Sequence, residues 1–126
     1  MNHSAALDRY RTIHEKTMPP EQVLLRLLEG LCATVAQAKA AVVERDIQAK
    51  TRAVDRALCV IGELTKALDA SVAPDLAARL MGLYAFTHRQ LLEGSATLDP
   101  AAFDHAARVL NVIHSAFRDA VSAPLP

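Results

Sequence analysis

Apolar residues recur at alternating spacings of three and four along four consecutive stretches of the chain, and this periodicity is the strongest constraint on its fold. The stretches cover residues 21–45, 47–69, 74–94 and 99–121. Side chains spaced in this way lie on one face of an α-helix, and no stretch shows the alternation of apolar and polar residues that a half-buried strand needs. The sequence therefore predicts four long helices joined by short links, and no β-strand.

Residues that favour helix ends agree with this division. The pair Pro19-Pro20 stops any helix before it and presets the first turn of the next one. Asp46 can cap the second helix through its side-chain oxygen, and Pro74 fits the first turn of the third. Gly94 suits a left-handed cap, so we expect the third helix to end there.

Each predicted helix carries one apolar stripe that can contribute to a shared core. Helices joined by short links are usually antiparallel neighbours. We therefore expect an all-α fold, an antiparallel four-helix bundle of residues 20–121, preceded by a short helical or mobile N-terminal segment of residues 1–17. Because 126 residues suffice for one such core, residues 1–126 should form a single domain. The stripes consist of Leu24, Leu28, Leu31, Val35, Ala38 and Val42; Ile47, Val54, Leu58, Ile61, Leu64 and Leu68; Leu76, Leu80, Leu83, Thr87 and Leu91; and Phe103, Ala106, Leu110, Ile113, Phe117 and Ala120.

The balance of charges excludes several classes of partner. Lys and Arg together number 14, and Asp and Glu also number 14, so the formal net charge is zero. A protein with zero net charge has no electrostatic field that would attract nucleic acid, and none that would hold the protein on an anionic membrane surface. The N-terminus lacks the apolar run of a signal peptide, and no stretch approaches the roughly 20 apolar residues of a membrane span. We expect a cytoplasmic protein without membrane insertion, in which Cys32 and Cys59 are buried reduced thiols.

Several apolar residues lie off the four stripes. They are Leu25, Val43, Val60, Phe86, Leu92, Val109 and Val112. One interpretation is a wide stripe, since globular helices often bury three or four positions in two turns. The other is a surface that binds a protein segment, because helices offer grooves that accept another amphipathic helix. Taken as a set, the residues favour the second interpretation.

Side chains capable of catalysis or metal binding are scattered along the chain. None of the five histidines has a second ligand at the spacing of a metal site. His105 and His114 are nine residues apart and so project from opposite faces of a helix. The chain also lacks a CxxCH haem motif, a GxSxG nucleophile motif and a glycine-rich phosphate loop. We therefore expect no enzymatic activity, no cofactor and no bound metal.

Two other functions remain open on the sequence. The stretch after His88 is similar to the phosphorylated helix of histidine phosphotransfer domains, which are also four-helix bundles. Gly94 comes six residues after His88 instead of four, however, and Glu93 stands where those domains place a lysine that stabilises the phosphoryl charge. The second alternative is a helical homo-oligomer, in which the surplus apolar residues meet copies of themselves.

Short blocks in order along the chain resemble a known family. The resemblance starts at Tyr10 and continues with PEQVL at 20–24, LLEG at 27–30, RALCVIGEL at 56–64, LMGLYAFTHRQL at 80–91 and IHSAF at 113–117. The block at 80–91 is the most specific of these. On these residues the chain resembles the flagellar secretion chaperone FliS family over nearly its whole length.

The resemblance implies a function and partners. Proteins of this family bind the C-terminal region of flagellin, which is disordered in the monomer, and prevent premature polymerisation before export. In the family, the segment before the bundle can cover part of the binding groove when no client is present, and it contributes to docking at the flagellar export gate. Leu7 and Tyr10 would have that role here. We expect a monomer or a weak homodimer.

Six residues of the predicted bundle are expected to line the flagellin-binding groove. They are Leu28, Val60, Tyr84, Phe86, Leu91 and Val112. Leu91 also fits the core, because it lies on a stripe, and Tyr84 fits a core residue whose hydroxyl reaches the surface. Phe86 lies off the stripe and is better explained by a partner.

Overall fold

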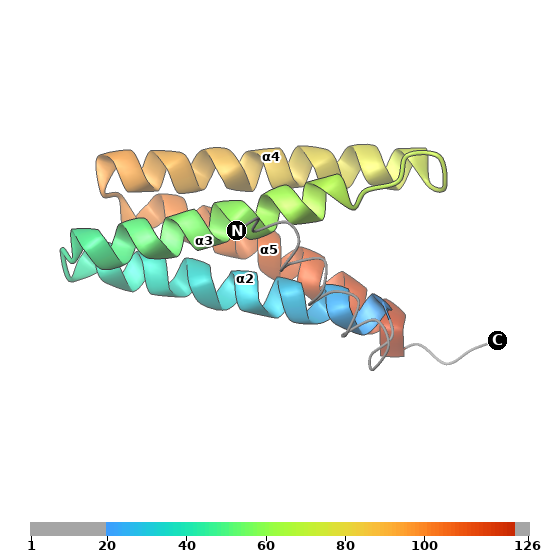
Figure 1. Cartoon of the computed structure of the whole chain (residues 1–126), viewed down its shortest axis with the longest axis horizontal. Coiled ribbons are helices and arrows are strands. Elements are labelled where there is room, and N and C mark those ends of the chain that lie inside the picture. The colour runs from blue at the N-terminus through green and yellow to red at the C-terminus, as the bar shows by residue number, and fades with distance from the viewer. Residues whose placement is uncertain (1–19, 123–126) are drawn as a thin grey trace, which may run out of the picture.

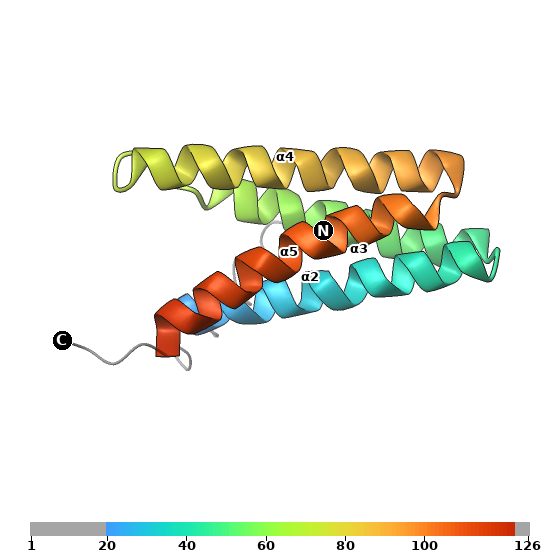
Figure 2. The same ribbon diagram turned by 180° about the vertical axis from the view of Figure 1, so that it is seen from behind.

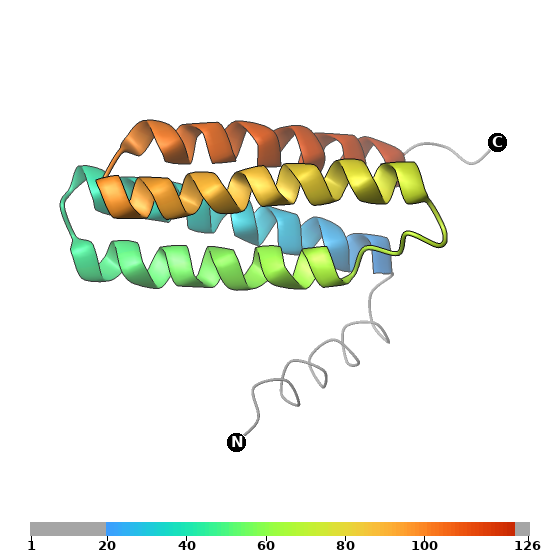
Figure 3. The same ribbon diagram turned by 90° about the horizontal axis from the view of Figure 1, so that it is seen from above.

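The four apolar stretches form four α-helices in the computed structural model of the chain, which describes residues 20–122. They are α2 (Pro20–Val43), α3 (Ile47–Lys66), α4 (Pro74–Thr97) and α5 (Pro100–Ser122). Each helix runs antiparallel to the next, and α5 returns to pack on α2, which closes the bundle (Figure 1, Figure 3). The prediction of an all-α four-helix fold is confirmed, and no strand occurs in the described range. Leu7 and Tyr10 lie outside the described residues.

Prolines and one aspartate fix where the helices begin. Pro20, Pro74 and Pro100 each occupy the first position of a helix, where the missing N–H removes no hydrogen bond. The Asp46 carboxylate accepts a hydrogen bond from the Ala49 N–H at 3.1 Å, which confirms the predicted N-cap of α3. The starts of the helices therefore follow from residue types that can be read along the chain.

The end of α4 differs from the prediction at Gly94. The helix continues through Gly94 to Thr97, and Leu98 takes the left-handed cap conformation with φ of 55° and ψ of 41°. A β-carbon on Gly94 would lie 2.7 Å from a ring carbon of Phe103, so α5 approaches α4 too closely for any side chain here. Gly94 is thus a packing residue inside the helix, and its prediction as a cap is wrong.

Arg45 also takes a left-handed conformation, with φ of 59°, in the turn between α2 and α3. The Asp46 N–H donates to the Ala41 carbonyl at 2.9 Å, which is the hydrogen bond of a Schellman motif with Arg45 in the position that glycine prefers. We predict that Arg45→Gly raises the free energy of unfolding by roughly 0.5–1 kcal/mol, because it removes the steric penalty of that conformation. Urea denaturation measures the change. Arg45→Ala keeps the penalty and should give no gain, so equal stability of the two variants would contradict the prediction.

The core consists of aliphatic and small side chains with two aromatic rings. Ala38, Ala57 and Ala106 are fully buried, which lets neighbouring helices approach closely. The Thr87 hydroxyl, also buried, donates to the Leu83 carbonyl at 2.9 Å and so leaves no unpaired polar group. The largest fully buried side chains are Tyr84, Phe103, Leu28, Leu31, Leu91, Leu110, Val35 and Thr87.

Four residues of the predicted stripes, Ile47, Leu76, Leu83 and Ala120, lie on the surface instead of in the core. Ile47, Leu76 and Leu83 are 47%, 51% and 38% exposed. On α4 the inward positions next to the two leucines are taken by Ala77 and Tyr84. Leu80, Thr87 and Leu91 of the α4 stripe are buried as predicted. The prediction is wrong for Leu76 and Leu83, because it counted large aliphatic residues and overlooked the alanine and the tyrosine that face the bundle axis.

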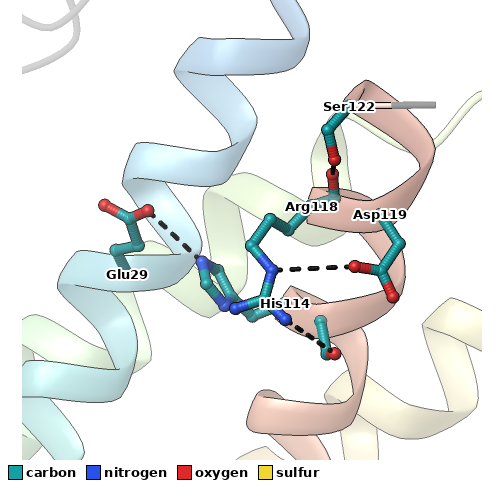
Figure 4. Close-up of polar contacts among 6 residues, drawn as sticks. Glu29, His114, Arg118, Asp119 and Ser122 are labelled. Atoms are coloured by element: carbon teal, nitrogen blue, oxygen red, sulfur yellow. Dashed lines mark hydrogen bonds and ion pairs between the residues drawn. The ribbon is translucent and has the colours of Figure 1, made fainter. Parts of the chain in front are cut away.

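Polar contacts join the helices at the edges of the core. Lys50 is buried, and its Nζ donates to the carbonyl and the hydroxyl of Ser95, each at 3.1 Å, which ties α3 to the last turns of α4. His114 Nε2 lies 3.3 Å from a carboxylate oxygen of Glu29 and links α5 to α2 (Figure 4). A surface contact such as the one between His114 and Glu29 contributes little stability, so apolar packing is the main interaction that holds the bundle together.

The two cysteines lie in different surroundings and form no disulfide. Cys32 is half-buried, and its burial raises the pKa of the thiol. Cys59 is exposed, because it lies two residues from both Ala57 and Ile61, which face the core. The prediction that the thiols are buried is therefore wrong for Cys59.

Candidate functional site

An apolar groove lies between α4 and α5 where the two helices diverge. Figure 2 shows the helices close together at the turn that joins them and separating toward the start of α4 and the end of α5. A hollow of about 340 Å³ lies in the separated part. We call it the α4–α5 groove, and its lining residues are Leu76, Arg79, Leu80, Leu83, Val112, Ile113, Ala116, Phe117 and Ala120.

The walls of the α4–α5 groove expose large apolar side chains to solvent. Besides Leu76 and Leu83 on α4, Val112 on α5 is 64% exposed. Leu80 and Ile113 are buried beneath them and form the floor. Covering apolar area contributes about 25 cal/mol per Å², so a partner that seals these walls gains affinity from their burial. The groove is therefore suited to the apolar face of another helix.

Polar groups play little part in the α4–α5 groove. Within residues 20–122, one side-chain hydrogen bond links α4 to α5, between Gln90 and His105 at 3.3 Å. It lies toward the connecting turn, and neither residue lines the groove. Arg79 is the one charged residue among those that do. The groove can recognise apolar surface and shape, and it contains no pair of groups that could transfer a proton.

A second groove lies between α3 and α4 and has a volume of about 500 Å³. Tyr84 forms part of its floor, and burial raises the pKa of the Tyr84 hydroxyl, so the phenol is neutral at physiological pH. That hydroxyl forms no hydrogen bond with another residue of the described range. We call this hollow the α3–α4 groove, and it is lined by Leu58, Ile61, Gly62, Thr65, Lys66, Met81, Tyr84, Ala85, His88 and Arg89.

The structure separates the residues that were expected to line one groove. Val112 lines the α4–α5 groove. Leu28 and Leu91 are 0% exposed, so these two are core residues and the expectation that they line a surface groove is corrected, whereas Tyr84, 2% exposed, forms part of the floor of the α3–α4 groove. Each is spaced three or four residues from other core residues of its helix and therefore faces the bundle axis. A partner on the closed bundle cannot reach Leu28 or Leu91.

Val60 and Phe86 are half-buried and line neither groove. Val60 packs against the core from α3. Phe86 follows Leu83 by three residues, so it lies one helical turn further along the side of α4 that faces α5. Of these two residues, Phe86 is the one that can extend the apolar surface of the α4–α5 groove.

The sequence prediction assigned Leu76 and Leu83 to the core and so missed the α4 wall of the α4–α5 groove. A usable signal was present. Leu83 and Tyr84 are adjacent, as are Leu76 and Ala77, and a helix can direct only one member of each pair toward the bundle axis. Choosing the phase that buries Ala77 and Tyr84 would have turned both leucines away from the bundle axis.

Groups that carry chemistry are dispersed over the described part of the chain. No three His, Cys, Asp or Glu side chains between residues 20 and 122 come together as a metal site. His88 is exposed beside Arg89 at the rim of the α3–α4 groove, and His105 and His114 each contact a side chain on a neighbouring helix. In the same range, no helix combines the length and apolarity that crossing a membrane requires. The described residues thus offer binding grooves and no cluster of reactive groups.

Known proteins similar to this chain belong to flagellar systems. The family described as "Flagellar protein FliS" matches residues 2–124, a range that contains all four helices and both grooves. A curated protein from Pseudomonas aeruginosa named "Flagellar secretion chaperone FliSB" is 28% identical over 96 residues, which cover 76% of this chain and 76% of that protein.

Proposed function

This chain belongs to the FliS family of flagellar proteins, and on that premise we propose that it is a cytoplasmic secretion chaperone for flagellin. In this proposal it binds the C-terminal region of flagellin, which is disordered in the monomer, and prevents flagellin from polymerising before export. The function needs binding alone, without catalysis, cofactor or metal. The flagellar export gate is a second proposed partner, contacted through the segment that contains Leu7 and Tyr10.

The observation that carries the proposal is an exposed apolar groove on a bundle of this family. Leu76, Leu83 and Val112 keep large side chains in water around a hollow that has almost no polar lining. An amphipathic segment with apolar residues at spacings of three and four can cover all three at once. Phe86 would add to the contact where the client continues along α4.

Binding in this groove would be coupled to folding of the client. A disordered segment loses chain entropy when it becomes helical, and apolar burial along the groove must offset that loss. The α4–α5 groove supplies apolar area and few directional hydrogen bonds, so it suits a helix that is defined mainly by its apolar face. A client held in this way cannot present the same face to other flagellin molecules, which is how binding would prevent polymerisation.

We predict that a flagellin C-terminal fragment binds the full chain with a negative heat-capacity change and gains helix as it binds. Both follow from burial of apolar surface by a segment that orders on contact. Isothermal titration calorimetry at several temperatures measures the first effect, and circular dichroism of the mixture against the sum of its components measures the second. A scrambled fragment of the same composition is the control.

Binding without added helix, or equal binding of the scrambled fragment, would contradict the proposed mode of recognition.

Two further experiments test the alternative functions, of which phosphotransfer is the first. Incubation with a response regulator charged by acetyl phosphate would leave acid-labile phosphohistidine at His88, and no such product is expected from a chaperone. Light scattering across a dilution series distinguishes the homo-oligomer, whose mass would fall on dilution whether or not the fragment is present.

A further inference from the structure

The α3–α4 groove combines an apolar floor with cationic ends. Ile61 and Tyr84 are buried at its base, and Met81 is half-exposed on one wall. Because α3 and α4 are antiparallel, Lys66 lies at the Met81 end, whereas His88 and Arg89 lie at the opposite end with Leu58. Residues 58 to 66 of α3 span about 12 Å at 1.5 Å per residue, so the ends are about two helical turns apart.

The lining of the groove places no acidic side chain between these ends. The residues that line the groove include no Asp or Glu. Lys66, His88 and Arg89 are exposed, and none of them forms a hydrogen bond or an ion pair with another residue of the described range. The α4–α5 groove, by comparison, has a single arginine and no second charge at its other end. Charge therefore distinguishes the two grooves.

We propose that the α3–α4 groove binds an acidic amphipathic helix of a protein partner, with apolar side chains on the groove floor and carboxylates about two turns apart beside Lys66 and Arg89. The carboxylates would complement the cationic ends and set the register of the partner helix. Met81 and Leu83 lie two residues apart on α4 and line different grooves, so the two grooves open on opposite sides of that helix. A helix in one groove leaves the other free, and the site goes beyond the flagellin surface proposed above.

Gly62 on α3 provides a sharp way to test the groove. It lines the α3–α4 groove, and a β-carbon added there would meet no atom within 4 Å. Glycine in a helix interior is unfavourable relative to residues with a side chain, so Gly62→Leu should melt at a higher temperature than the parent while its side chain fills the groove. Once melting shows that this variant is folded, loss of binding cannot be attributed to unfolding. Gly30 on α2 also has open space and lines neither groove, so Gly30→Leu is the matched control.

The probe is a fluorescent synthetic helix with Glu at positions i and i+7 and Leu at i+3 and i+4, all on one face, and we call it the Glu–Leu helix. Two companion peptides serve as controls. In the first, the Lys–Leu helix, both Glu are replaced by Lys, and in the second both Leu are replaced by Ser. Fluorescence anisotropy with the full chain should show binding of the Glu–Leu helix that weakens with added salt, and binding of both companions at least tenfold weaker. Lys66→Glu combined with Arg89→Glu should weaken the Glu–Leu helix by roughly tenfold and reverse the preference toward the Lys–Leu helix.

Gly62→Leu should lose the Glu–Leu helix while Gly30→Leu binds it as the parent does. The proposal is overturned if the Lys–Leu helix binds the parent equally well, if the peptide without leucines binds as tightly as the probe, or if Gly62→Leu binds normally. Tighter binding of a single-stranded oligonucleotide than of the probe, lost on the same charge reversal, would also overturn it and assign the cationic ends to nucleic acid.

Discussion

Gly94→Val is expected to lower the free energy of unfolding by about 3 kcal/mol, at the upper end of what overpacking a core costs. A β-carbon at Gly94 would lie 2.7 Å from one ring carbon of Phe103 and 3.0 Å from two others. The Phe103 ring is 0% exposed and cannot swing into solvent to make room. Valine adds two methyl groups beyond that β-carbon, so α4 and α5 would have to move apart. Urea denaturation followed by circular dichroism measures the loss.

The control for this prediction is Gly82→Ala on the same helix. No atom lies within 4 Å of a β-carbon at Gly82, so alanine there should raise the free energy of unfolding by about 1 kcal/mol through helix propensity alone. Phe103→Leu should restore part of the stability lost by Gly94→Val, because the two substitutions share one contact. Strictly additive effects of the two, or a stable Gly94→Val protein, would show that α4 and α5 do not meet as described.

The combined substitution of Leu83→Asp and Val112→Asp is expected to weaken binding of the flagellin C-terminal fragment by roughly 100-fold, or about 2.7 kcal/mol. Each substitution removes apolar area from a wall of the α4–α5 groove and places a carboxylate where the client would exclude water. Both side chains are exposed in the free protein, so the bundle should fold. Calorimetry gives the affinity, and thermal melting confirms that the variant is folded.

The matched control is Val43→Asp combined with Leu92→Asp. These two residues are 62% and 47% exposed and line neither groove. The control makes the same chemical changes on the same bundle with the same change in net charge. It should bind the fragment as the parent does, and an equal loss of affinity in both double variants would mean that general charge repulsion, and not the groove, governs binding.

Local sequence signals predicted the helices well because each acts within a few residues. Pro74 and Pro100 stand at the starts of α4 and α5, and the Asp46 side chain caps α3 as predicted. The end of α4 depended on a tertiary contact, since Gly94 packs against Phe103. A glycine near the end of an apolar stripe fits a cap and a close helix contact equally well, and only the position of α5 distinguishes them.

The groove was harder to predict than the fold because its residues are defined by which way each helix is rotated. Reading α4 from its leucines placed Leu76 and Leu83 inward, whereas the helix buries Ala77 and Tyr84. A small rotation of the helix about its own axis moves some residues from the core to the groove and others from the groove to the core, while the bounds of the helix stay the same. Val112 was predicted to lie at the surface, and it does. It lies off the apolar stripe of α5, and no rotation of the helix that buries Leu110 and Ile113 also buries Val112.

The central claim is that a client helix covers the α4–α5 groove of the closed bundle. Methyl NMR of the protein labelled at Leu and Val, titrated with the flagellin C-terminal fragment, tests it most directly. We predict that the methyl signals of Leu76, Leu83 and Val112 shift with saturation at the calorimetric affinity, while those of Val43 and Leu92 stay in place. Shifts confined to Val43 and Leu92, or saturated binding that leaves the groove methyls unchanged, would contradict the claim.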